Sequence, residues 1–436
     1  MVDSPPSTLA APSTTARARP PRIGVVDAVR GLACVAMIAW HAADCWIGPP
    51  ARDGWGFERV RLVGGFAAPF FLWLAGLSLA LSTELRPSWE RTVTGLVRAC
   101  WVVAVGYALK LFAWTVDHGA VTDPRNLLTL GLAIPAAGAL LFALREPALG
   151  SAPTRRGAFV IGAGVLFATY AFVGGASHGP DVLTRLDVLH GIGAALAVLG
   201  LLLFVLGRVL PSEDARAVVL ALLAITIALT TPRWIGVDLP LPSRLVDWIA
   251  RVVPDPAASG ARFPLFPWLG HALYGATIGT LLRASPRELG PHDIPFVKRP
   301  FELVLATLVV ACLVFEGGWV GPAITARAEW MRPVLRLTFY GTTAMGCAGV
   351  LAYAGRLVPS AYEALVVMGR SSLFVYGAHL ELVYGLVGSP FRRSLGWTGW
   401  AVGALLVTLL MVWGARRLEA WERREERRRA RPLPAG

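Results

Sequence analysis

Long apolar stretches alternate along the chain with short polar connections. A helix needs about 20 apolar residues to cross a bilayer. A window of that length gives twelve candidate spans, near residues 23–47, 62–82, 93–115, 126–143, 157–175, 187–209, 215–231, 263–284, 301–318, 334–354, 369–389 and 396–415. The seventh is short and glycines interrupt the fifth and ninth, so a count of ten or eleven also fits. The pattern predicts an all-α fold, a polytopic integral membrane helical bundle with about 10–12 transmembrane helices.

Polar segments flank this apolar region at both ends. Residues 1–21 are rich in Ser, Thr, Pro and Ala, a composition typical of a disordered tail. We expect no cleaved signal peptide, because the apolar run that follows is long enough to span and keeps charged residues. The predicted organisation is a disordered cytoplasmic tail over 1–21, one transmembrane domain over 22–416 and a basic cytoplasmic tail over 417–436.

Composition and charge support a membrane class over a nucleic-acid-binding one. Hydrophobic residues make up 55% of the chain and charged residues 16%, while the net charge is +13. Many arginines and lysines lie in short loops and in the C-terminal tail, where they set topology and contact anionic headgroups. We therefore expect membrane lipids as partners, no nucleic acid, and both termini on the cytoplasmic side of the plasma (inner) membrane. The five cysteines have no metal-ligand spacing, so neither a metal nor a disulfide framework is expected.

The first span carries ionisable residues that are costly inside a bilayer. Arg30 and His41 are eleven positions apart, about three helical turns, so both project from one face at an axial separation of about 16 Å. Asp27 precedes Arg30 by three residues and is placed to pair with it, and Asp44 lies one turn beyond His41. The structural alternative is a juxtamembrane arginine and a satisfied core histidine. The functional interpretation is an arginine that holds an anion and a histidine that handles a proton.

These residues, together with later motifs, resemble the sequence patterns of known membrane protein families. Asp27-x-x-Arg30-Gly31 followed by His41 resembles the opening of the acyltransferase-3 family, with its Arg-x10-His spacing. Four further motifs are similar to those of the heparan-α-glucosaminide N-acetyltransferase catalytic-domain-like family, within the same transmembrane acyltransferase superfamily. They read Gly-Gly-Phe-Ala-Ala-Pro-Phe-Phe-Leu-Trp-Leu-Ala-Gly over 64–76, Arg-Leu-Asp-Val-Leu-His-Gly-Ile-Gly over 185–193, Phe-Pro-Leu-Phe-Pro-Trp-Leu-Gly over 263–270 and Gly-Arg-Ser-Ser-Leu-Phe-Val-Tyr-Gly-Ala-His over 369–379. The first loop holds no histidine, so His41 follows the acyltransferase-3 pattern.

The resemblance implies an acyl-CoA-dependent O- or N-acyltransferase that modifies a hydroxyl or amine of a glycan or other envelope acceptor. The donor would be acyl-CoA, acetyl-CoA in the simplest case, and its phosphates would lie near Arg30, Asp27, Arg86 and Arg91. His41 would act as general base with Asp44 orienting its imidazole, or would carry the acyl group covalently. Acceptor contacts would come from Arg185, His190, Trp268, Tyr376 and His379.

Each of the motif residues also has a purely structural interpretation. Arg185 and His190 open a span and suit capping or snorkelling, Trp268 suits an interfacial anchor, and Gly275 with Gly279 suits helix packing. The rival function is a transporter or flippase for a lipid or polar small molecule, which inverted repeats would favour, and none is visible. Acceptor identity and oligomeric state, including a homodimer, stay open.

Overall fold

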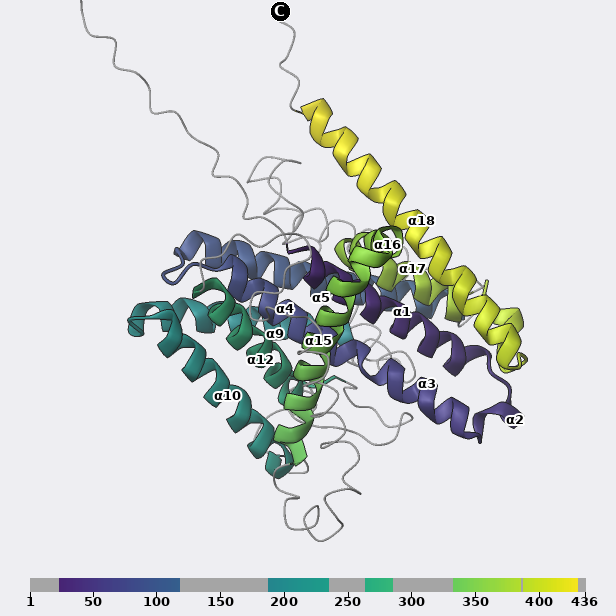
Figure 1. Ribbon diagram of the computed structural model, residues 1–436, viewed down its shortest axis with the longest axis horizontal. Helices are drawn as coiled ribbons and strands as arrows, with labels where there is room; N and C mark the ends of the chain where they lie inside the picture. The colour runs from purple at the N-terminus through teal and green to yellow at the C-terminus, as the bar shows by residue number, and fades with distance from the viewer. Residues whose placement is uncertain (1–22, 118–186, 235–262, 285–331, 386, 430–436) are drawn as a thin grey trace, which may run out of the picture.

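The computed structural model describes residues 23–117, 187–234, 263–284, 332–385 and 387–429 (Figure 1). Within these ranges the regular secondary structure is entirely helical, which confirms the all-α prediction. Six of the described helical segments are long and apolar enough to cross a membrane, namely Gly24–Trp46, Trp55–Ser82, Trp89–Leu109, Val188–Val209, Glu213–Thr231 and Trp397–Arg424. The predicted spans near 126–143, 157–175 and 301–318 lie outside the described residues.

The helices follow the order of the predicted spans, with some boundaries displaced. They are α1 (Gly24–Trp46), α2 (Pro49–Arg52), α3 (Trp55–Gly65), α4 (Ala67–Ser82), α5 (Trp89–Asp117), α9 (Val188–Val209), α10 (Glu213–Trp234), α12 (Leu265–Ala284), α15 (Arg332–Leu357), α16 (Pro359–Arg370), α17 (Ser372–Tyr384) and α18 (Trp397–Arg429), with a 3-10 turn at Ser389–Phe391.

The largest boundary differences are near the C-terminus. The segment predicted as one span over 369–389 holds the end of α16 and the shorter helix α17, because the two helices meet at Ser371, which leaves the helical conformation with φ −98° and ψ 23°. The basic segment after 416 continues α18 as helix, where Glu419 and Arg423 pair one turn apart at 3.0 Å.

Glycines set the closest helix crossings. A Cβ atom built on Gly76 of α4 would overlap the backbone carbonyl of Ala272 on α12, and one on Gly275 or Gly279 would overlap the carbonyls of Trp73 or Leu77. Backbones approach this closely only where side chains are absent, which is how small residues drive helix association in lipid. The helix-packing interpretation of Gly275 and Gly279 is therefore confirmed.

The same device joins α1 to α16. A Cβ on Gly31 would overlap the Leu365 carbonyl, and one on Gly369 would overlap the Asp27 carbonyl. The glycine of the Asp-x-x-Arg-Gly motif and the glycine that opens the 369–379 motif therefore face each other's helix. This crossing places residues of the first and second halves of the chain side by side, and it positions the site described below.

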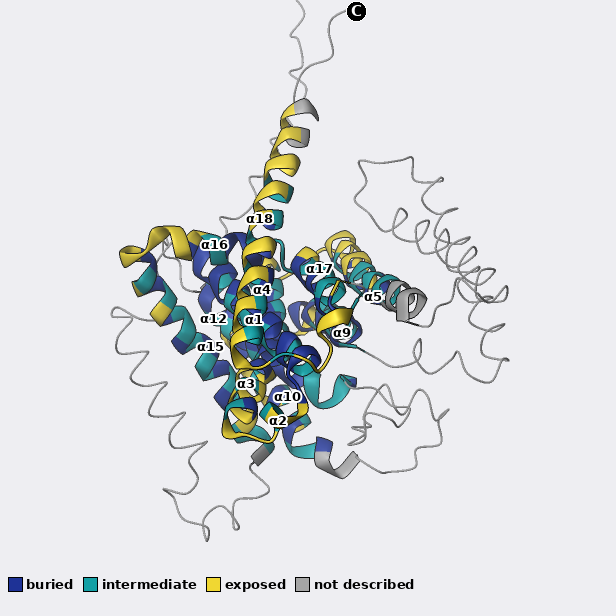
Figure 2. Ribbon diagram, turned by 90° about the vertical axis from the view of Figure 1, so that its right-hand side faces the viewer, coloured by how far each residue is buried: buried dark blue, intermediate teal, exposed yellow. Residues whose placement is uncertain are grey.

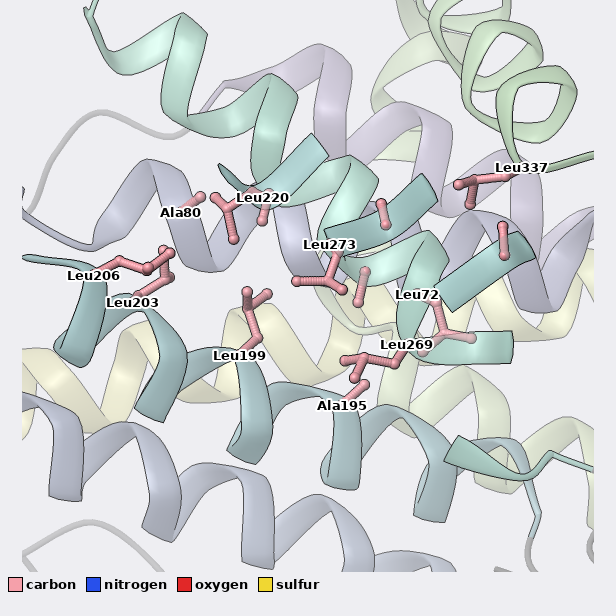
Figure 3. Close-up of a cluster of buried hydrophobic side chains, with 14 residues drawn as sticks. Leu72, Ala80, Ala195, Leu199, Leu203, Leu206, Leu220, Leu269, Leu273 and Leu337 are labelled. Carbon is pink, nitrogen blue, oxygen red and sulfur yellow. The ribbon is translucent and has the colours of Figure 1, made fainter. Parts of the chain in front are cut away.

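A second packing centre lies where α4, α9, α10 and α12 meet (Figure 3). Its core is mostly leucine, including Leu72, Leu199, Leu203, Leu220 and Leu273, each at most 1% exposed. Apolar burial of this kind stabilises the assembly through close packing, because lipid tails offer little hydrophobic drive between helices. Helix α12 is interrupted at Phe266, whose φ and ψ are −102° and 127°.

Helix α18 covers one side of the molecule and extends beyond the other helices at its C-terminal end (Figure 1). Much of its surface is exposed (Figure 2), and most of the exposed side chains in its first five turns are apolar, among them Val402, Leu405, Leu409 and Trp413. An apolar outer face of this kind is typical of a helix that meets lipid. Helix α1 packs against α18. It also contacts α3, α4, α15, α16 and α17.

The C-terminal end of α1 and the loop that precedes α18 are joined through the backbone. The loop before α18 donates from Arg393 N to Cys45 O at 3.0 Å and from Leu395 N to Trp46 O at 2.9 Å, while Gly48 N donates back to Leu395 O at 2.9 Å. These bonds satisfy carbonyl groups at the C-terminus of α1 that have no partner within the helix. The first and last described helices are therefore neighbours in the fold.

Candidate active site

Two histidines from distant parts of the chain form the centre of the site. His41 of α1 and His379 of α17 lie with Nδ1 and Nε2, respectively, 2.8 Å apart, and their ring planes are within 3° of parallel. His379 is fully buried, while His41 is partly exposed. The structure therefore brings together the two membrane histidines that the sequence places in the first and late motifs.

The hydrogen bonds around this pair define the tautomer of each ring. His379 Nδ1 lies 2.8 Å from the carbonyl oxygen of Val375, an acceptor, so this nitrogen carries the proton and donates. In a neutral imidazole the other nitrogen is then an acceptor, so His379 Nε2 accepts from His41 Nδ1–H. The lone pair of His41 consequently lies on Nε2. A neutral histidine whose Nδ1 is held in this way has the arrangement of a general base or a nucleophile.

Asp44 is connected to this pair through Tyr384. Its carboxylate accepts from Tyr384 Oη at 3.1 Å and from Arg52 Nη2 at 3.2 Å. Tyr384 in turn meets the His41 ring edge to face, with centroids 5.6 Å apart. The orienting partner that the structure gives to His41 Nδ1 is His379, so an effect of Asp44 on the imidazole passes through Tyr384.

Arg52 holds this end of α1 in place. Its Nη1 donates to the Asp44 carbonyl at 2.8 Å, and its guanidinium lies 4.5 Å from the centroid of the Phe57 ring. A cation next to the C-terminal carbonyls of a helix is favourable because that end carries a partial negative charge. Arg52 therefore fixes both the helix end and the carboxylate that bonds Tyr384.

On its other side the histidine pair connects to the start of α9. The Tyr376 ring lies 5.8 Å from the His379 ring, edge to face, and its hydroxyl donates to Asp187 Oδ2 at 3.1 Å. Asp187 is the N-cap of α9, where it forms a capping box with His190, whose Nδ1 accepts from Asp187 N at 3.3 Å. The capping interpretation of His190 is thus confirmed, and its ring, 2% exposed, packs against Tyr107.

Charged side chains gather toward the N-terminal end of α1. Arg30 Nη1 donates to Asp27 Oδ1 at 2.7 Å, which confirms the predicted pair, and Nη2 donates to Ser78 Oγ of α4 at 2.9 Å. Arg370 Nε, at the end of α16, lies 3.5 Å from Asp27 Oδ2. Both Arg30 and His41 thus face other helices of the bundle, as the predicted one-face arrangement requires.

The remaining predicted residues lie apart from these two groups or outside the described ranges. Arg86 is exposed in the connection between α4 and α5, and Arg91, in the first turn of α5, pairs with Glu84 of that connection at 2.5 Å. Trp268 packs beside Phe263 and the leucine core of α9, α10 and α12. Arg185 lies outside the described residues.

Four contributors to the site were missed from the sequence, namely Ser78, Asp187, Arg370 and Tyr384. Two of them carried a local signal. Asp187 stands immediately before an apolar run, where an N-cap is expected, and Arg370 directly follows the glycine of the 369–379 motif. Ser78 and Tyr384 become visible only once the helices are packed. In the described part of the chain, no group of three or more His, Cys, Asp or Glu side chains is arranged to hold a metal ion.

Sequence comparison finds two family matches, and both lie N-terminal to α16 and α17. Residues 23–126 match the family described as acyltransferase domain, and residues 126–307 match the catalytic domain of heparan-alpha-glucosaminide N-acetyltransferase. No curated protein matches the chain. Helices that are long and apolar enough to cross a membrane, together with these two adjoining matches, support a membrane acyltransferase. The matches support assignment to the transmembrane acyltransferase superfamily, with an acyltransferase-3-like opening followed by a region similar to the heparan-alpha-glucosaminide N-acetyltransferase catalytic domain.

Proposed function

We propose that the protein transfers an acyl group, acetyl in the simplest case, from cytoplasmic acyl-CoA to a hydroxyl or amine of a glycan or other envelope acceptor. The hydrogen-bonded pair of His41 and His379 is the observation that carries this proposal, because it leaves a histidine lone pair on Nε2 within a membrane domain of an acyltransferase family. Arg30 lies about 16 Å along the same helix by the rise per residue. One helix therefore supplies an anion-binding group and a proton acceptor.

In the direct mechanism, His41 Nε2 removes the proton from the acceptor hydroxyl or amine as the acceptor atom attacks the thioester carbonyl. The new bond forms between the acceptor atom and the acyl carbon, the carbon–sulfur bond breaks, and CoA leaves as the thiolate. The proton held on Nε2 then passes to that thiolate or to water. His379 stabilises the imidazolium by accepting from Nδ1–H throughout.

A covalent variant uses the same lone pair. His41 Nε2 attacks the thioester, CoA leaves as thiolate, and the acyl-imidazole is then attacked by the acceptor, whose proton is released as the acyl–nitrogen bond breaks. The two routes differ in one measurable respect. Acid-quenched single-turnover reactions with radiolabelled acetyl-CoA leave label on the protein in the covalent route and none in the direct one.

The placement of donor and acceptor follows from the expected topology. With both termini in the cytoplasm, Arg30 and Asp27 lie toward the cytoplasmic side and His41 and Asp44 toward the outer side. The phosphates of acyl-CoA would bind near Arg30, whose planar guanidinium suits phosphate oxygens. Tyr376, His379 and the residues at the start of α9 would meet the acceptor, and the reaction would link a cytoplasmic donor to an envelope acceptor.

The test is acyl transfer by the purified protein in neutral detergent. Incubation with radiolabelled acetyl-CoA and a panel of amino sugars and neutral glycans should give a labelled product. Excess acetyl-CoA should also raise the melting temperature, because a ligand that binds only the folded state stabilises it, by about 2.7 kcal/mol at 100 times Kd. A protein that neither transfers label nor gains stability from acetyl-CoA, palmitoyl-CoA or free CoA would contradict the proposal.

A further inference from the structure

Two arginines from opposite ends of the chain share one carboxylate. Asp27 accepts from Arg30 through Oδ1 at 2.7 Å and lies 3.5 Å from Arg370 Nε through Oδ2. The three side chains are only partly accessible, with exposed fractions of 19% for Arg30, 31% for Arg370 and 10% for Asp27. Two guanidinium groups therefore contact one partly buried carboxylate.

The backbone enforces this meeting. Gly369 packs directly against the Asp27 carbonyl and Gly31 against the Leu365 carbonyl, so α1 and α16 cross with their backbones in contact. Arg370 follows Gly369, and Arg30 precedes Gly31. The crossing thus brings the two guanidinium groups to the same carboxylate, because each arginine is adjacent in sequence to a glycine of the helix contact.

Both guanidinium groups keep hydrogen-bonding capacity. Each has five N–H donors in a planar fork. Within the described residues, Arg30 donates to Asp27 and Ser78, and Arg370 pairs with Asp27 and, through Nη1, with Glu419 of α18 at 3.6 Å. Paired forks with unused donors around one carboxylate match a ligand with several phosphate oxygens, because arginine binds such oxygens in a bidentate manner.

Glu419 is the fourth charge in this group. It is 15% exposed and also pairs with Arg423 on its own helix at 3.0 Å. An anion that binds Arg370 would therefore compete with Glu419. On displacement, Glu419 would still be paired with Arg423. Arg370 Nη1 therefore already has a carboxylate partner on α18, at 3.6 Å.

We propose that Arg370 and Arg30 together form the binding site for the diphosphate of the acyl-CoA donor, and that Glu419 occupies Arg370 until the donor displaces it. This inference rests on the proposed acyl-CoA-dependent function and adds to it the residue that pairs with Arg30 and the internal competitor. Helix α18 would then regulate donor binding through Glu419. Asp27 is the positioning residue that holds the two guanidinium groups at one place.

The experiment compares two donors on the purified full-length protein in neutral detergent. Acetyl-CoA carries the diphosphate, and S-acetylpantetheine carries the same thioester without it. Arg370→Gln should raise KM for acetyl-CoA about ten- to hundredfold, the effect of losing a hydrogen bond to a charged group, with little change in transfer from S-acetylpantetheine. Arg370→Lys should restore part of the loss. Arg416→Gln, which removes an exposed arginine of α18, is the charge-matched control and should leave both donors unchanged.

Glu419→Gln tests the competitor with the opposite sign. Removing this carboxylate should tighten CoA binding about two- to fivefold, since partly exposed ion pairs contribute little. A misfolded variant does not bind its ligand more tightly, so this result separates the proposal from a loss of structure. Weaker or unchanged binding would overturn the role of Glu419.

Two other outcomes separate the hypotheses. Equal KM for acetyl-CoA in wild type and Arg370→Gln, with transfer intact in both, overturns this inference and leaves the proposed function standing. A wild-type protein that transfers from neither donor overturns the proposed function itself. An anionic lipid headgroup presents similar phosphate chemistry, so titration with phosphatidylglycerol is run in parallel. An Arg370→Gln variant that loses phosphatidylglycerol binding and keeps CoA binding assigns the site to lipid and overturns the proposal.

Discussion

His41 Nδ1 lies 2.8 Å from His379 Nε2, although the two residues are 338 positions apart in the chain. The Val375 carbonyl holds the proton of His379 on Nδ1, so the bond between the rings runs from His41 to His379. In this tautomer the lone pair of the His41 imidazole lies on Nε2. The first four predictions below concern this pair, the arginine three turns away and the helix crossing that positions them.

Replacing His41 with alanine should abolish proton handling and leave donor binding nearly intact. General base assistance contributes about 10²–10⁴-fold to a rate, so single-turnover acyl transfer should fall by that factor. CoA affinity, measured by calorimetry, should change little because the imidazole is about 16 Å from Arg30 along the helix. Full transfer activity in His41→Ala would exclude His41 as base or nucleophile.

Replacing Arg30 should have the complementary effect. Arg30→Ala should weaken CoA binding about tenfold or more, because it removes a charged donor to phosphate. Arg30→Lys should recover only part of the affinity, since an ammonium lacks the planar fork. The measurement is CoA binding to each folded variant, and an unchanged Kd in Arg30→Ala would contradict the donor assignment.

His379 is expected to act through His41. His379→Phe keeps the ring volume and removes the acceptor, so transfer should fall about 10–100-fold, as is typical when the partner that orients a catalytic imidazole is lost. His379→Gln places an amide oxygen near the former Nε2 position and should retain more activity than His379→Phe. Equal activities for the two variants would show that the acceptor at this position does not matter.

The glycine crossing of α1 and α16 gives a stability prediction. Gly369→Ala forces a methyl group against the Asp27 carbonyl, and overpacking of this kind costs about 1–3 kcal/mol. The matched control is Gly200→Ala in α9, where a Cβ meets nothing within 4 Å and helix propensity favours alanine by up to about 1 kcal/mol. Melting temperatures in detergent should fall for the first variant and stay or rise for the second.

Membrane orientation is a separate prediction from the distribution of positive charge. A cysteine placed at Ala430 should react with a membrane-impermeant maleimide only after the cell membrane is opened, and one placed in the 232–262 segment should react in intact cells. Cys100, which is exposed, needs replacement by serine first. Labelling of Ala430→Cys in intact cells would place the C-terminus outside and remove the link between a cytoplasmic donor and an outer acceptor.

The sequence predicted most of the described helices and the contacts that form within one helix, but not the contacts between helices that complete the site. Apolar run length gave the helices, and residue spacing gave the Asp27–Arg30 pair, because both depend on local geometry alone. The partner of His41 depended on how α17 packs against α1, and spacing within one helix carries no information about that contact. The same reason hid Tyr384 and Ser78. Assigning Asp44 as the direct orienting group of His41 followed from their proximity in sequence, whereas the fold turns Asp44 toward Tyr384 and Arg52.

The backbone bonds between the end of α1 and the loop before α18 have a consequence for biosynthesis. Helix α1 is synthesised well before its partners His379, Leu395 and α18. At about 5–20 residues per second, the 338 positions between the two histidines take about 20–70 seconds to translate. During this interval His41 Nδ1 lacks the acceptor that His379 Nε2 supplies in the folded protein. The pairing that orients His41 can therefore form only after α17 has been synthesised and has packed against α1.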